Sequence, residues 1–68
     1  MNKFSGQLNY IKAVVKKCWF SGGIGIIELE DKVFPIYLDW RCLQNILEDF
    51  PDLVGREIDF IHGTIRVF

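Results

Sequence analysis

The residues with catalytic chemistry are few and widely spaced. His62 is the single histidine among 68 residues, and it stands beside Gly63 in a pair typical of a tight turn. Cys18 and Cys42 lack the CxxC spacing of a metal or redox site and are expected to be reduced packing residues. Four of the five aspartates lie where turns and helix ends are expected, without a paired-carboxylate arrangement: Asp31, Asp39, Asp49 and Asp52. The sequence therefore predicts a protein that is not an enzyme and holds no metal or cofactor.

Aromatic rings and lysines are interleaved in the first part of the chain, a combination that suits single-stranded nucleic acid. Bases stack on aromatic rings while cations follow the phosphate backbone. The residues predicted to bind RNA or DNA are Lys12, Lys16, Lys17, Trp19, Phe20, Phe34, Tyr37 and Trp40. In a chain of 68 residues many of these rings must also build the core, so packing and binding compete for the same side chains.

Length and composition indicate one small globular domain, residues 1–68. Half of the residues are hydrophobic and 25% are charged. The net charge of -1 shows no basic excess of the kind that domains held mainly by phosphate contacts carry. No apolar run approaches the roughly 20 residues that span a bilayer, and the first residues lead into no signal-peptide core, so a cytoplasmic location is expected.

Three elements stand out beyond the first 23 residues. Residues 24–30 and 33–38, joined at Asp31-Lys32, are typical of a β-hairpin, with Pro35 placing its second strand at an edge or a bulge. A short amphipathic helix is predicted from Trp40 to Phe50, with Asp39 as its N-cap and Pro51 as its stop. Residues 56–61 and 64–68 flank the His62-Gly63 turn and form a second hairpin.

Residues 8–20 fit two structures. The i, i+3, i+4, i+7, i+8 spacing of Ile11, Val14, Val15, Cys18 and Trp19 indicates an amphipathic helix. Their β-branched and aromatic composition favours a long strand that bends midway and buries one face early and the other late. The helix would give an α+β fold in the order helix, hairpin, helix, hairpin.

The residues from Val14 to Tyr37 resemble the cold-shock domain family. In that family a first strand ending in Trp-Phe, here Trp19-Phe20, precedes a Gly-aromatic-Gly-aromatic-Ile strand, here residues 23–27, and then a Val-Phe-x-His-Phe strand, here residues 33–37. Residues 53–60 are similar to the family's fourth strand, so the resemblance covers roughly residues 14–60. It implies a mainly β fold, a small five-stranded OB-type barrel in which residues 8–20 are a strand, with single-stranded nucleic acid as the partner.

Three positions depart from the family and open a second hypothesis. Isoleucine stands at 24, 26 and 36, where the family carries rings or a histidine, and aliphatic side chains do not stack on bases. The patch predicted for a protein partner consists of Ile24, Ile26, Phe34 and Ile36. Such a patch suits a small protein-binding regulator, an inhibitor or a homodimeric subunit.

Overall fold

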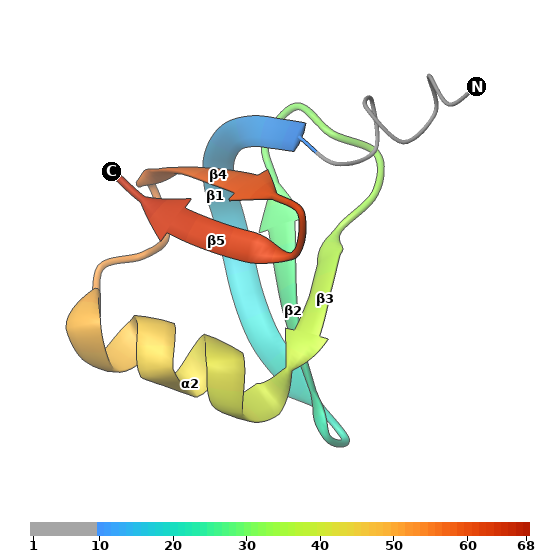
Figure 1. Ribbon diagram of the computed structural model, residues 1–68, viewed down its shortest axis with the longest axis vertical. Coiled ribbons are helices and arrows are strands. Elements are labelled where there is room, and N and C mark those ends of the chain that lie inside the picture. The colour runs from blue at the N-terminus through green and yellow to red at the C-terminus, as the bar shows by residue number, and fades with distance from the viewer. Residues whose placement is uncertain (1–9) are drawn as a thin grey trace.

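The computed structural model describes residues 10–68, which form a five-stranded antiparallel sheet and one α-helix (Figure 1). In chain order the elements are β1 (Tyr10–Ser21), β2 (Ile24–Leu29), β3 (Ile36–Asp39), α2 (Trp40–Asp49), β4 (Glu57–Ile61) and β5 (Thr64–Val67). This order, three strands, a helix and two strands, is the predicted one. Within this range no helix has the length and apolar content needed to cross a membrane.

The sheet is built around β1, which pairs with two different strands. Residues 10–14 pair with β4, and residues 15–21 pair with β2. A strand therefore replaces the helix that the spacing of residues 8–20 allowed, and the α+β alternative is wrong for residues 10–20. Residues 8 and 9 lie outside the described range.

A β-bulge at Lys16 bends β1 between its two partners. Val15 lies opposite Leu29 and Lys17 lies opposite Glu28, so Lys16 is an extra residue on β1. A bulge bends its strand and increases the local twist. Here the bend turns the β2–β3 hairpin away from the β4–β5 hairpin, and the two hairpins lie on different parts of the molecule (Figure 1).

The bulge also explains the helix-like spacing in this segment. Before it, the odd-numbered residues Ala13 and Val15 are buried in the core, and after it the even-numbered Cys18 packs against that core. Alternate residues of a strand face opposite sides, so one extra residue exchanges the two sets. The resulting step of three residues between Val15 and Cys18 imitates one turn of an amphipathic helix.

The connection between β2 and β3 is longer than the sequence indicates. The predicted second strand, residues 33–38, begins only at Ile36, and residues 30–35 form a loop. Pro35 has no N–H to donate to a ladder and directly precedes the first paired residue of β3. Val33 and Phe34 therefore lie in the loop rather than in the strand.

The predicted helix and the second hairpin are confirmed. The Asp39 carboxylate accepts a hydrogen bond from the Arg41 backbone N–H at 2.9 Å and caps α2, which ends one residue before the Phe50-Pro51 pair. His62 has φ 50° and Gly63 has φ 82°. Positive φ at both central residues is the requirement of a type I′ hairpin turn, which joins β4 to β5.

The sheet is open rather than closed into a barrel. Its strand order is β3-β2-β1-β4-β5, and in the described residues β3 and β5 are its two edges. The fold is therefore mainly β with one helix, as predicted. The predicted barrel is not closed, because β3 and β5 do not pair.

Helix α2 covers the β2–β3 hairpin and completes the core. Leu43 is fully buried and lies directly over Gly25 of β2. The other buried hydrophobic side chains are Ala13, Val15, Ile27, Leu29, Ile36, Leu53 and Ile58. Gly25 matters because a Cβ added there would lie 2.6 Å from the Leu43 Cβ, an atom fixed to the helix backbone. The absence of a side chain at residue 25 thus sets how closely the helix approaches the sheet.

Replacing Gly25 with alanine is expected to destabilise the fold by about 1–3 kcal/mol, because the helix must move away from β2 to admit the methyl group. The matched control is Gly23→Ala, since a Cβ there meets only the Trp40 ring at an ordinary 3.9 Å. Urea unfolding followed by circular dichroism measures both free energies. Equal stability of the two variants would contradict the close approach.

Candidate functional site

Trp19, Ile26 and Tyr37 form a row across three strands on the outward face of the sheet. Ile26 pairs with Trp19 on one side and with Tyr37 on the other. Residues directly opposite one another in an antiparallel pair project from the same face, with Cβ atoms about 5 Å apart. Trp19 is 39% exposed and Tyr37 is 64% exposed, while Ile26 between them is half-buried. We call these three residues the outward row.

Two lysines stand at one end of the outward row because of the bulge in β1. Lys16 and Lys17 place their ammonium groups 4.0 and 3.9 Å from the carboxylate of Glu28. The Lys17 Nζ also lies 5.1 Å from the centre of the Trp19 ring. A regular strand would send two consecutive side chains to opposite faces, so the extra residue is what gathers both cations beside one carboxylate.

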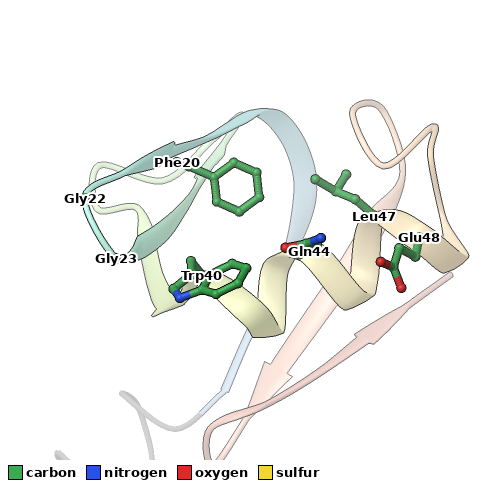
Figure 2. Close-up of a pocket in the computed structure, with 7 residues that line it drawn as sticks. All are labelled: Phe20, Gly22, Gly23, Trp40, Gln44, Leu47 and Glu48. Carbon is green, nitrogen blue, oxygen red and sulfur yellow. The ribbon is translucent and has the colours of Figure 1, made fainter.

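Phe20 and Trp40 lie on a different surface from the outward row. Phe20 follows Trp19 in β1 and points to the opposite face, toward α2 (Figure 2). With Leu47 of the helix, these two rings line an open groove of about 540 Å³. The remaining lining residues are Gly22, Gly23, Gln44 and Glu48. No binding role is predicted for Leu47, Gln44 and Glu48, although their helical spacing from Trp40 places them on neighbouring positions of α2.

The remaining predicted nucleic-acid residues, Lys12 and Phe34, lie in two further places. Phe34 is in the β2–β3 loop and is 78% exposed. Lys12 belongs to the half of β1 that pairs with β4, and its Nζ lies 5.4 Å from the centre of the Phe68 ring. The eight predicted residues are thus divided among four locations, and the outward row with its two lysines contains four of them: Lys16, Lys17, Trp19 and Tyr37.

The four residues of the predicted protein-binding patch are likewise separated. Ile24 is exposed at the start of β2, and Ile26 is half-buried in the outward row. Ile36 is only 4% exposed and belongs to the hydrophobic core, because it faces inward beneath α2. An exposed role for Ile36 is therefore wrong, and Phe34 lies apart from the other three in the loop.

A buried carboxylate was not anticipated from the sequence. Asp59 is 2% exposed and accepts two hydrogen bonds from Arg66, from Nε at 3.0 Å and from Nη2 at 2.6 Å. These hydrogen bonds lower the pKa of the Asp59 carboxyl. A two-residue turn at His62-Gly63 places residues 59 and 66 opposite one another, so the sequence contained the signal for this ion pair.

The described residues contain little that suits catalysis or metal binding. Asp59 is held by Arg66, and His62 is exposed in its turn. Burial raises the pKa of the half-buried Cys18 thiol, which opposes formation of the reactive thiolate. Across residues 10–68, no group of three or more His, Cys, Asp and Glu side chains has the arrangement of a metal site. Nor does this range contain a buried side-chain nitrogen or oxygen without a hydrogen-bond partner.

No protein-family model, curated protein or solved structure matches the chain.

The lowered pKa of Asp59 predicts a loss of stability in acid. A carboxyl whose pKa is lower in the folded state stabilises the fold above its unfolded pKa of about 3.9, and this contribution disappears as the pH falls through the folded value. Asp59→Asn should therefore be less stable than the original chain at pH 7, with a difference that shrinks toward pH 2. Urea unfolding at a series of pH values measures the difference.

Asp31→Asn provides the control, because it removes the same charge from the exposed β2–β3 loop. We expect it to retain the acid dependence of the original chain. A constant difference between Asp59→Asn and the original chain across this pH range would contradict the role of the ion pair.

Proposed function

We propose that this protein is a non-catalytic binding module of OB type that binds single-stranded RNA or DNA across the outward row. The observation that carries the proposal is the register that aligns Trp19, Ile26 and Tyr37 on one face with Lys17 beside the Trp19 ring. Rings on an open sheet face accept bases without sequence preference, because every base has a face to stack.

The outward row has room for two stacked bases with an apolar contact between them. Trp19 and Tyr37 are separated by the width of two strand spacings, about 10 Å, with Ile26 at the midpoint. Each stacked base contributes about 1–3 kcal/mol. Ile26 cannot stack, but its side chain offers an apolar surface against which a sugar or a base edge can pack. Two rings support a modest affinity.

The electrostatic part of the affinity is small and comes from Lys16 and Lys17. Glu28 lies within 4.0 Å of both ammonium groups and offsets part of their charge. For single strands the logarithm of the binding constant falls with the logarithm of salt concentration by about 0.7 per phosphate neutralised. Two lysines therefore correspond to a slope of about -1.4. Such a shallow slope agrees with a chain whose net charge is -1.

The strand order supports the OB type. An OB fold is a partly open five-stranded barrel whose oligonucleotide-binding face lies on its second and third strands. In this protein β2 and β3 supply Ile26 and Tyr37, β1 supplies Trp19, and the helix follows β3 as the family resemblance implies. The edges β3 and β5 are the strands whose approach would close the barrel.

Replacing Trp19 tests the stacking contribution directly. Trp19→Leu should weaken binding of a fluorescently labelled oligothymidylate by about 5- to 150-fold, the equivalent of one lost stack of about 1–3 kcal/mol. Trp19→Phe should retain most of the affinity because it keeps a ring. Fluorescence anisotropy at low salt measures both.

Phe68→Ala is the control, since it removes an exposed ring from the residue that follows β5, on the other half of the molecule. An equal loss in Phe68→Ala and Trp19→Leu would place binding elsewhere, and the absence of any binding by the original chain at low salt would refute the proposal.

Replacing Glu28 tests the electrostatic contribution. Glu28→Gln should strengthen oligonucleotide binding several-fold at low salt, because Lys16 and Lys17 lose the carboxylate that offsets them. The gain should diminish as salt rises. Anisotropy titrations over a range of salt concentrations measure it, and Glu57→Gln, on a strand of the other half-sheet, is the charge-matched control. Weaker binding by Glu28→Gln would contradict the role assigned to the two lysines.

A further inference from the structure

The groove beneath the β1–β2 turn exposes two aromatic rings, Phe20 and Trp40. Phe20 and Trp40 lie on either side of it, and Leu47 lines it farther along α2 (Figure 2). Both rings are nearly half exposed. Gly22 and Gly23 have no side chains to cover the rings at the turn, and Gly22 adopts φ 62°, where another residue would be strained. The local backbone thus keeps the groove open.

In residues 10–68, the unpaired charge that lines the groove is a carboxylate of α2, because the nearby Arg41 guanidinium, 5.9 Å from the centre of the Trp40 ring, is held by Asp39 at 3.1 Å. Glu48 is the charged residue among those that line the groove, and no cation of the described residues lies within 4.0 Å of its carboxylate. An occupant that fits this surface presents an apolar side chain together with a neighbouring positive charge.

The chain itself carries a segment with this chemistry in the β2–β3 loop. Val33 and Phe34 are 90% and 78% exposed, the two highest values among the large hydrophobic side chains described. Lys32 precedes them, and its only described ion pair is with the exposed Asp31 at 3.7 Å, a contact of little strength. These two adjacent and almost fully exposed hydrophobic side chains offer an apolar surface to a partner.

Phe34 cannot enter the groove of its own chain. The β2–β3 loop lies at the start of β3, whereas Trp40 and the β1–β2 turn lie at its other end, so the loop and the groove are at opposite ends of the hairpin (Figure 1). The β2–β3 loop of this chain can therefore meet such a groove only in a second copy of the chain.

We propose that two copies of this chain form a dimer in which Phe34 of each copy inserts into the groove of the other, between Phe20 and Trp40. In this arrangement Lys32 of the loop lies near Glu48 of the receiving groove. A two-fold axis beside β3, an edge strand of the sheet in residues 10–68, sets the two β3 strands antiparallel, which brings the loop of one copy level with the β3–α2 junction of the other. Each loop then meets a groove, and the contact closes without leaving a surface for further addition.

This dimer does not depend on nucleic-acid binding. Trp19 and Tyr37 project from the outward face, while the groove lies on the face covered by α2. The two reciprocal loop contacts form a small interface, and small interfaces are typical of weak, reversible association.

Sedimentation velocity at protein concentrations up to about 1 mM tests the dimer. The original chain should shift from monomer to dimer as concentration rises, and Phe34→Ala should weaken the association at least about 100-fold, because the anchor is lost at both contacts. Val54→Ala, which shortens another exposed hydrophobic side chain outside the groove and the loop, should have no effect. A monomer at every concentration, or equal weakening by both variants, would overturn the proposal.

Charge reversal tests which surfaces meet. Lys32→Glu and Glu48→Lys should each weaken self-association about tenfold, because like charges then face one another at both contacts. A mixture of the two variants should form a mixed dimer as stable as the original, since each loop then faces a groove of opposite charge. The control variants Lys12→Glu and Glu57→Lys make the same charge changes on the other half-sheet and should leave self-association unchanged. Equal weakening by the control variants, or no recovery in the mixture of Lys32→Glu with Glu48→Lys, would overturn the proposed contact.

Discussion

The bulge at Lys16 is the constraint on which the rest of the structure depends. Because one residue of β1 has no counterpart on β2, the strand bends and pairs with one hairpin on each side of the bend. After the bulge, even-numbered rather than odd-numbered residues of β1 face the core. Val15 and Cys18 therefore both contact the core, while Trp19 projects outward. It also gathers Lys16 and Lys17 beside Glu28. A regular strand would produce neither the core nor this cluster.

The bend and the helix divide the surface into regions with different chemistry. The outward row has rings and lysines and suits a single-stranded nucleic acid, whereas the groove at α2 is apolar with one carboxylate and suits an apolar side chain beside a cation. Because adjacent residues of a strand face opposite sides, Trp19 and Phe20 serve different surfaces despite being neighbours in sequence. The two surfaces for which we propose partners therefore do not overlap.

Local signals in the sequence predicted the elements that depend on local chemistry. Asp39 and Pro51 mark the ends of α2, and the His62-Gly63 pair marks the β4–β5 turn. The start of β3 was placed too early because loop and strand residues look alike when both are apolar, and Val33-Phe34 has the composition of a strand. Burial of Ile36 was missed for a related reason: the resemblance to the cold-shock family placed it on the outer face, but the register turns it toward α2.

The sequence by itself determined a mainly β fold with a capped helix and a tight second hairpin, together with the aromatic and lysine residues on which the proposed binding depends. Only the tertiary structure decided how those residues are divided, since cross-strand register and the position of the bulge depend on pairing between distant segments. It brought Trp19, Ile26 and Tyr37 into one row, moved Phe20 and Trp40 to the groove, and left Phe34 exposed in the loop. It also left the sheet open. No local pattern could predict this, because pairing between the edge strands β3 and β5 would be a long-range contact.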